Sequence, residues 1–331
     1  MINAVSKFLK IGVLMTVFLL SVCTPNADKS PDINKNTHTN TQESTQNNAQ
    51  TPTALNDTQP IKVMTPDWGV AMNLLALDII PVAIGEVRNY DEWVAEPALP
   101  KQVIDLGLRF TPNSELLAWL VEQGLIEQVI DTEFYAQIRP QYKNISLTTV
   151  DFNSQETMAT WDGFARATWQ IAKTVNKQAQ AQIYITRTKD EIRAIGERFT
   201  QRNPSIRSLA VVQFVDENNL RLYGQSSIFY PATKQMGLSL VIMGQSNQWG
   251  FVPITLNDLA KLPKDSCLLV VKPYSAILQQ NLQNNAIWQR LGFGKTRCMG
   301  VLEPIWMYGG IPSLYSFAKR LDGVVLMGVS S

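Results

Sequence analysis

The sequence predicts an α/β protein whose folded body has two α/β lobes joined by a single long α-helix. From residue 61 onward, short apolar segments rich in β-branched residues alternate with segments of helical periodicity. The stretch 154–202 has a helical pattern, and no glycine or proline occurs between Phe164 and Ile195. The body is about 270 residues long, a size at which chains generally divide into more than one core.

Residues 61–153 form the first predicted lobe. Five segments are expected to be strands because they are short and apolar, and two are expected to be helices. The second helix follows Asn113, a residue type that often caps a helix N-terminus. The expected strands are 61–64, 80–84, 103–106, 127–130 and 145–150, and the expected helices are 67–76 and 114–122.

The helical segment 154–202 is expected to cross between the lobes as one stiff element, with its apolar residues on one face: Ile185, Ile192, Ile195 and Phe199. The second lobe then spans 203–331. Its expected strands are 208–215, 220–223, 268–271 and 298–302, and its expected helices are 275–289 and 312–321. Two lobes joined in this way predict a ligand cleft at their interface.

The first 23 residues have the pattern of an export signal. Lys7 and Lys10 precede an apolar run at 11–22, which is too short to remain in a bilayer as a spanning helix. Cys23 follows, and the segment LSVC is similar to a bacterial lipobox, whose cysteine is lipidated. Val22 stands where that motif normally has Gly, Ala or Ser, so cleavage without lipidation remains an alternative. Either process places the protein in the periplasm or cell envelope.

Residues 24–60 are dense in Asn, Thr, Gln, Asp and Ser and contain almost no large apolar side chains. Such a segment buries too little surface to offset the entropy of ordering, so we predict a disordered polar tether. The whole chain has a formal net charge of +1, and no basic run follows the signal. This charge pattern argues against a nucleic-acid partner.

The folded body contains no histidine, since the single histidine of the chain is His38 in the tether. Catalysis by Ser-His-Asp or Cys-His and every His-ligated metal site are therefore excluded. Phosphate-binding loops and dinucleotide fingerprints are also missing from the sequence. A carboxylate pair or a Ser-Lys pair remains open, but no spacing singles one out. A binding protein is favoured over an enzyme.

Four blocks of sequence carry a resemblance to a known family. They are YDEWVAEPALPKQVIDLGLRFTPNSELL at 90–117, NQWG at 247–250, ITLNDLA at 254–260 and PIWMYGG at 304–310. In this order they closely resemble the periplasmic ferric-hydroxamate-binding proteins of siderophore ABC importers. The likeness extends over about the whole folded body.

The resemblance implies the class III periplasmic binding protein fold, with two α/β lobes bridged by one long helix. It implies that the chain captures an iron(III)-hydroxamate siderophore and delivers it to an inner-membrane permease, without performing a reaction. The chelator already fills the coordination shell of the iron, so neither a metal ligand from the protein nor a cofactor is expected. A monomer is expected.

The resemblance also implies ligand-binding residues. Arg109 matches the family's arginine, whose planar guanidinium donates to the hydroxamate oxygens. Family positions that line the cleft are occupied here by Trp68, Trp93, Trp249, Trp306 and Tyr308. The family's hydrogen-bonding tyrosine is assigned to Tyr135, although the neighbouring Phe134 leaves the alignment open. The tryptophans left to packing are Trp119, Trp161, Trp169 and Trp288.

Two acidic residues match family positions that dock onto arginines of the permease. Glu115 matches the first position and Asp258 lies near the second. Each also has a simpler explanation, because each is placed in the first turn of an expected helix, where a carboxylate is favourable.

Cys267 and Cys298 occur in or beside two expected strands of the second lobe. An exported protein permits a disulfide, but the sequence does not show that their Cα atoms are close enough. A disulfide and two buried thiols both remain open, and the thiols are preferred.

Two other functions remain open. Another class III ligand, such as a catecholate or carboxylate siderophore or cobalamin, differs mainly in the cleft lining that it needs. A histidine-free envelope enzyme or an inert adhesion-type lipoprotein is the alternative from a different class. The preferred siderophore does not follow from the sequence.

Overall fold

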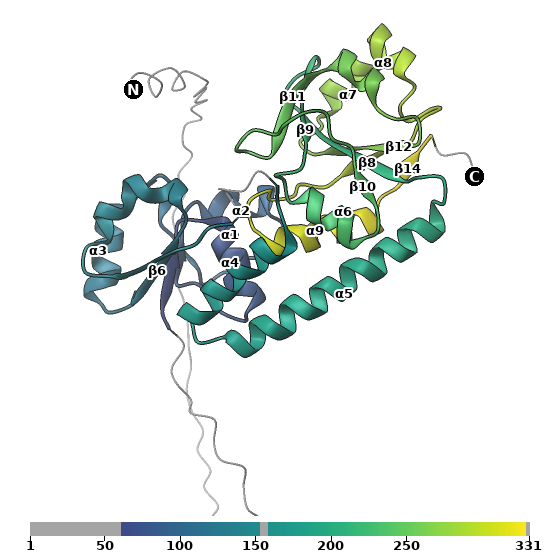
Figure 1. The fold of residues 1–331 in the computed structure, drawn as a ribbon. Helices are drawn as coiled ribbons and strands as arrows, with labels where there is room; N and C mark the ends of the chain where they lie inside the picture. Colours follow the sequence, from purple (N-terminus) through teal and green to yellow (C-terminus); the bar gives the residue numbers. More distant parts are fainter. Residues whose placement is uncertain (1–60, 153–157, 329–331) are drawn as a thin grey trace, which may run out of the picture. The chain divides into compact units, whose positions relative to one another are not determined.

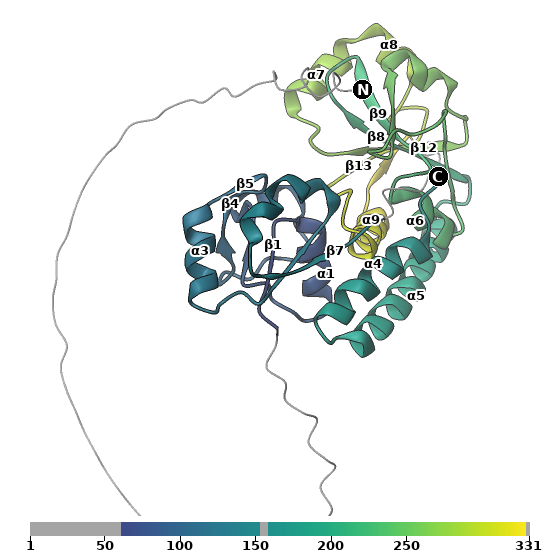
Figure 2. The same cartoon turned by 60° about the vertical axis from the view of Figure 1, so that its left-hand side comes forward.

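The structure is a computed structural model, and it describes residues 61–152 and 158–328 (Figures 1 and 2). The predicted export signal with Cys23 and the predicted tether at 24–60 lie outside these residues. The described residues belong to one compact unit. Among them, no helix combines the length and the apolar character that crossing a membrane requires.

The first lobe, called the N-lobe here, is built on a five-stranded parallel sheet with the strand order β3-β2-β1-β6-β7. All five predicted strands are confirmed, although β2 and β3 retain only two residues each. The strands are β1 Val63–Thr65, β2 Ala83–Ile84, β3 Ile104–Asp105, β6 Gln128–Asp131 and β7 Ser146–Thr149. A two-stranded hairpin of β4 Gly107–Leu108 and β5 Thr111–Pro112 follows β3.

Both predicted helices of the N-lobe are confirmed, and each begins at a side-chain cap. Asp67 Oδ1 accepts hydrogen bonds from the first-turn amides of α1, Trp68–Ala76. Asn113 Oδ1 does the same for α3, Ser114–Glu122. Two further elements were not predicted, namely α2 Val87–Trp93 and the 3-10 helix η1 Glu133–Tyr142.

The second lobe, called the C-lobe here, contains a seven-stranded mixed sheet with the order β11-β9-β8-β12-β13-β14, in which β10 also pairs with β8. Asp216 closes the turn between β8 and β9, because its Oδ1 accepts hydrogen bonds from the amides of Asn218 and Asn219. The strands are β8 Ser208–Phe214, β9 Asn219–Tyr223, β10 Ser239–Leu240, β11 Phe251–Thr255, β12 Ser266–Val271, β13 Met299–Leu302 and β14 Leu326–Met327.

The helix predicted at 275–289 is two helices. Asn285 has an extended backbone, with φ −84° and ψ 120°, and its side chain accepts from the amides of Ile287 and Trp288. It therefore ends one helix and caps the next. The helical elements of the C-lobe are α6 Phe229–Gln235, the 3-10 helix η2 Leu256–Lys261, α7 Ala276–Asn284, α8 Ala286–Leu291 and α9 Ile311–Asp322.

The helical segment predicted at 154–202 is also broken. It contains α4 Trp161–Thr174 and α5 Gln178–Arg202, separated by Asn176 in the left-handed region at φ 56°. Asparagine adopts this conformation more readily than most residues, so the chain turns there without glycine or proline. Only α5, with 25 residues and a length of about 37 Å, runs from the N-lobe to the C-lobe sheet (Figures 1 and 2).

The apolar face predicted on α5 is confirmed, because Ile185, Ile192, Ile195 and Phe199 are all buried. Close packing on this face needs a glycine. A Cβ added to Gly196 would lie 2.2 Å from the carbonyl oxygen of Met236, just after α6. The helix is thus held against α6 at a distance that no larger residue permits.

One apolar core passes continuously from the N-lobe through α4, α5 and α9 into the C-lobe sheet. At its centre, the buried Asn73 of α1 donates to the carbonyl of Gly309 at 2.9 Å and accepts from Thr168 of α4 at 2.8 Å. The expectation that each lobe buries a separate core is therefore only partly right, since smaller clusters belong to single lobes.

The packing role predicted for four tryptophans holds for three of them. Trp161 and Trp288 are buried, and Trp169 packs partly against the core. Trp119 is 50% exposed, so its assignment to packing is wrong.

Cys267 and Cys298 form a disulfide. The parallel register of β12 and β13 pairs Leu268 with Met299, which brings the two preceding residues side by side with a Cα–Cα distance of 4.6 Å. The preference for two free thiols was wrong, because strand register is set by the whole sheet and not by the local sequence.

Candidate functional site

Arg109 lies among aromatic rings from both ends of the chain. Its guanidinium carbon is 4.0 Å from the centroid of the Trp68 ring and 5.2 Å from that of Trp306. Trp68 is the first residue of α1 and is only 1% exposed, and its indole N–H donates to the carbonyl of Gly85 at 2.8 Å, so it supports Arg109 from the core and is not itself part of the cavity lining. The two indoles meet edge to face with centroids 4.9 Å apart. A cation over indole faces is attractive, and here it holds the guanidinium in place.

Glu86 orients Arg109 from the other side. Its Oε2 accepts from Arg109 Nε at 2.6 Å, and the two side chains are only 15% and 19% exposed. Glu86 has a left-handed backbone with φ 54°, at the start of α2. Glu86 is not predicted from the sequence, because neither its left-handed backbone nor its closeness in space to Arg109 leaves a local signal.

Phe134 and Tyr135 point into different surroundings. Successive residues of a 3-10 helix are rotated by about 120°. Tyr135 is 3% exposed, and its ring stacks on Phe110 with centroids 5.0 Å apart. Burial raises the pKa of Tyr135 far above its ordinary value, and the nearby Asp67 carboxylate adds to this effect. Phe134 is 43% exposed and is the residue of this pair that faces the C-lobe.

Trp249 supplies the facing ring of the C-lobe. It stacks on Phe134 with centroids 5.2 Å apart, and it meets Tyr308 edge to face at 5.9 Å. The NQWG loop holds it there, since Asn247 Oδ1 accepts from the amide of Trp249 at 2.9 Å. Gly250 has a φ of 82°, and an added Cβ would also press on Ser227. Tyr308 then contacts Trp306 at 5.5 Å, which makes the aromatic surface continuous.

A cavity of about 540 Å³ lies beside this aromatic surface and between the lobes. Phe134 and Thr132 line it from the N-lobe. Trp249, Tyr308 and Ser227 line it from the C-lobe. Of its lining residues, all from the described ranges, none is Lys, Arg or His. The predicted cleft at the lobe interface therefore corresponds to a hollow whose walls carry aromatic rings, hydroxyl groups and the carboxyl groups of Asp67, Glu133 and Asp151.

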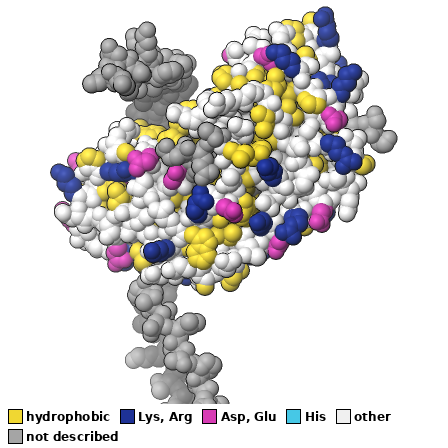
Figure 3. Space-filling view, viewed as in Figure 1, with side chains coloured by type: hydrophobic (Ala, Val, Ile, Leu, Met, Phe, Trp, Pro, Cys, Tyr) yellow, Lys and Arg dark blue, Asp and Glu magenta, His cyan; other side chains and the backbone are white. Residues whose placement is uncertain are grey.

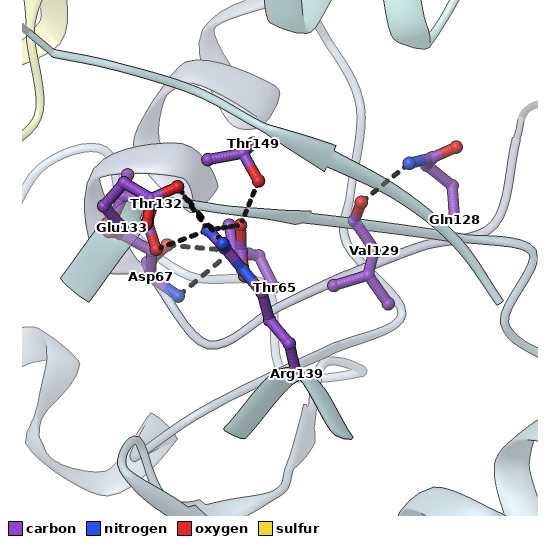
Figure 4. Close-up of polar contacts among 9 residues, drawn as sticks. Thr65, Asp67, Gln128, Val129, Thr132, Glu133, Arg139 and Thr149 are labelled. Atoms are coloured by element: carbon purple, nitrogen blue, oxygen red, sulfur yellow. Dashed lines mark hydrogen bonds and ion pairs between the residues drawn. The ribbon is translucent and has the colours of Figure 1, made fainter. Parts of the chain in front are cut away.

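A polar network below the cavity fixes the start of η1 (Figure 4). The fully buried carboxylate of Asp131 accepts two hydrogen bonds from Arg139, at 2.8 and 3.1 Å, and one from Thr149 Oγ1 at 3.1 Å. Thr132 Oγ1 donates to Asp67 Oδ2 at 2.7 Å. Burial raises the pKa of Asp67, although its hydrogen bonds oppose this effect. The network ties β6, α1 and η1 together and so positions Phe134.

Trp93 is not brought to this aromatic surface. It is the last residue of α2 and is 38% exposed. The ring contacts found within the described residues join the other predicted aromatic residues but do not include Trp93. Its predicted place in the cleft lining has no support from the geometry.

The two predicted docking residues have different surroundings. Glu115 is exposed in the first turn of α3. Asp258 accepts from both the amide and the hydroxyl of Thr255, and it pairs with Lys261 at 2.7 Å. The Lys261 ammonium is the main cause that holds the pKa of Asp258 well below its ordinary value. Asp258 therefore caps the start of η2, as its simpler explanation predicts.

Within residues 61–152 and 158–328, no group of three or more His, Cys, Asp or Glu side chains could hold a metal ion. The arrangement suits a ligand with an apolar body and oxygen acceptors, which indole faces and a guanidinium recognise.

Comparison with known proteins points in the same direction. No family model matches the chain. A curated relative, the iron(3+)-hydroxamate-binding protein FhuD of Escherichia coli (strain K12), is 26% identical over 269 residues, which are 80% of this chain and 87% of the relative. The siderophore-binding protein FhuD of Vibrio cholerae, solved with Fe3+-Desferal, has a TM-score of 0.68 at 21% identity and covers 80% of this chain and 98% of its own.

The chain has the fold of the class III periplasmic binding proteins. FhuD2 of Staphylococcus aureus, solved with ferrioxamine B, has the same fold with a TM-score of 0.55 at 15% identity, covering 80% of this chain and 97% of its own. FeuA of Bacillus subtilis, a triscatecholate siderophore-binding protein, reaches 0.57 at 14% identity, covering 80% and 92%. The predicted fold class is therefore confirmed. At identities this low, the structural similarity shows the fold only. The identity of the ligand has to be argued from the residues that line the cleft.

Proposed function

We propose that this chain is the substrate-binding component of an ABC importer and captures iron(III)-hydroxamate siderophores in the cleft between its lobes. One observation carries the proposal: the guanidinium of Arg109 lies 4.0 Å from the ring centroid of Trp68, in the same aromatic surface that continues through Trp306 to Tyr308 and Trp249. The relatives with similar sequence or fold include an iron(3+)-hydroxamate-binding protein and a siderophore-binding protein.

The chemistry of such a ligand fits these side chains. An iron-hydroxamate complex presents carbonyl and hydroxamate oxygens around a metal whose coordination shell is full, together with a largely organic backbone. Arg109 would donate to the oxygens through the guanidinium N–H groups that Glu86 does not use. The indole and phenyl faces would cover the organic part. The chain needs no catalytic group and no metal ligand for this task.

The cleft can supply useful affinity. A large aromatic side chain buries about 150–250 Å² when it is fully covered. Partial coverage of three or four rings, together with Arg109, would leave about −8 kcal/mol after the cost of association. That free energy corresponds to about micromolar binding.

The cellular setting extends the proposal. Export by the signal at 1–23, with lipidation at Cys23, would hold a monomeric protein at the inner membrane in the periplasm or cell envelope. There it would meet the permease, with Glu115 on the N-lobe as the first docking residue and Asp258 on the C-lobe as the second. Charge reversal at both positions should abolish siderophore uptake and leave siderophore affinity unchanged. Normal uptake by that variant would remove the docking role.

A titration panel tests the ligand class. The purified protein is titrated with ferrichrome-like, linear hydroxamate, catecholate and carboxylate iron chelates and with cobalamin, and quenching of tryptophan fluorescence is followed. Saturable quenching by the hydroxamates at about micromolar concentration is expected. Saturation by another chelate alone would place the chain with a different class III ligand. Lack of response to all of them would overturn the proposal.

A further inference from the structure

A second hollow, of about 540 Å³, lies on the C-lobe away from the cleft, between η2, α8 and the loop before β13. Three cationic side chains line it, namely Lys264, Arg290 and Arg297. Four apolar side chains lie between them: Ala260, Leu262, Ile287 and Leu291. Asn257 and Thr296 complete the lining, which contains no acidic residue. We call this hollow the basic groove.

The cations of the basic groove are not neutralised from within the chain. In the described part of the protein, Lys264 and Arg290 make neither an ion pair nor a side-chain hydrogen bond, and both are exposed. The neighbouring Lys261 contrasts with them, because it is paired with Asp258 at 2.7 Å. Figure 3 shows dark blue side chains gathered over the α8 end of the C-lobe.

Arg297 forms a fixed wall of the groove. One of its terminal nitrogens donates to the carbonyls of Leu262 and Pro263, at 3.1 and 3.0 Å, and its guanidinium carbon lies 4.3 Å from the centroid of the Phe293 ring. Its Nε is buried without an acceptor among the described residues. Arg297 therefore contributes a positive charge that no carboxylate of the described residues balances.

We propose that the basic groove docks a peptide segment of a partner protein that carries acidic side chains between aliphatic ones. Aliphatic side chains would cover Ile287 and Leu291, and carboxylates would meet Lys264 and Arg290 at the rim. On the proposed function, on which this inference rests, the partner is the membrane subunit of the importer.

The shape of the groove favours a peptide over other anions. A small anion such as phosphate would fill little of about 540 Å³ and would leave the apolar wall uncovered. A bilayer surface is nearly flat and cannot follow a concave wall, so lipid headgroups would reach the rim only. A peptide segment can contact both the cations and the apolar residues, because both line the same hollow.

The test reverses the charge of the groove without touching its wall. Lys264→Glu/Arg290→Glu alters two exposed side chains that make no hydrogen bond in the described structure, and Arg297 is left intact. The variant is expected to lower iron-hydroxamate uptake by about tenfold when it replaces the native protein in its own cells. Siderophore affinity, measured by fluorescence quenching, should stay unchanged. Lys101→Glu/Lys173→Glu makes the same change in net charge at exposed N-lobe positions and should take up iron normally.

A crosslinking experiment identifies the occupant. A benzophenone side chain at Ile287, at the groove, should crosslink to an Asp- and Glu-containing segment of the membrane subunit, mapped by mass spectrometry. The crosslink should disappear in the charge-reversed protein. Uptake unaffected by charge reversal would overturn the inference, and so would charge-dependent sedimentation with vesicles of equal phosphatidylglycerol and phosphatidylcholine in place of the protein crosslink. If wild-type protein fails to bind any hydroxamate, the proposed function fails instead, whatever the crosslink shows.

Discussion

The ring of Phe134 in η1 stacks on the ring of Trp249 in the NQWG loop, with centroids 5.2 Å apart and planes at 13°. The two residues come from different lobes and are separated along the chain by the whole helical segment. Both rings remain about two-fifths exposed, at 43% and 39%. The lobes therefore meet at the cleft through an apolar contact that a ligand can reach.

The Phe134–Trp249 stack should be measurable as an energetic coupling. In a double-mutant cycle of Phe134→Ala and Trp249→Ala, the coupling in the unfolding free energy should be about 0.5–1.5 kcal/mol. Urea unfolding of the four proteins provides the measurement. Strictly additive effects would show that the stack does not form in solution.

Arg109→Ala should weaken hydroxamate binding by at least about tenfold, because the guanidinium is a charged donor held against the rings of Trp68 and Trp306. The same change leaves the largely buried Glu86 carboxylate without its partner and should lower stability by about 1–3 kcal/mol. Arg109→Ala/Glu86→Gln is the matched control, which should regain stability but not affinity. An affinity equal to that of the wild type, by fluorescence quenching, would remove Arg109 from the site.

Arg139→Ala should lower the free energy of unfolding by about 3 kcal/mol, since it strands the Asp131 carboxylate in the protein interior. Replacing both charges, as Asp131→Asn/Arg139→Gln, should cost less. Chemical unfolding measures both variants. Equal losses would mean that the buried charge itself is not the cause.

The Cys267–Cys298 disulfide closes a loop with a sequence separation of 31 residues. In the chain-entropy model, a loop of this size stabilises the folded state by about 3–4 kcal/mol. Cys267→Ala/Cys298→Ala should show a loss of that order in urea unfolding, and the unfolded wild type should gain the mass of two hydrogen atoms on reduction. An intact mass insensitive to reductant would contradict the bridge.

Asp322 should make stability fall in acid. Its pKa lies below the ordinary 3.8, mainly because Arg198 of α5 donates to it, with Arg202 also contributing. A carboxyl group whose folded pKa is depressed contributes its full stability above the unfolded pKa and loses it as pH falls through the folded pKa. The loss should therefore appear below about pH 4, and Asp322→Asn should reduce it. These are exposed pairs, so the effect should be about 1 kcal/mol or less. An identical acid profile for both proteins would contradict this role.

Local sequence predicted the elements that local interactions form. Asn113 marked the start of α3 because a cap needs only its own first turn, and the apolar face of α5 followed from helical spacing. The break at Asn176 was missed because asparagine permits a left-handed backbone without requiring it. Of the aromatic residues that the resemblance named, Trp249 and Tyr308 line the hollow between the lobes, Trp68 is buried behind Arg109, and Trp93 lies apart from them.

The sequence by itself determined the α/β character of the chain, the five strands of the N-lobe and the residue types suited to an organic, oxygen-bearing ligand. Only the tertiary structure decided that Phe134, and not Tyr135, faces Trp249, that Glu86 holds Arg109, and that Cys267 lies beside Cys298. Periodicity and capping act within a few residues, so they can be read along the chain. Contacts between distant segments depend on how helices and sheets pack, and a single sequence does not record that packing.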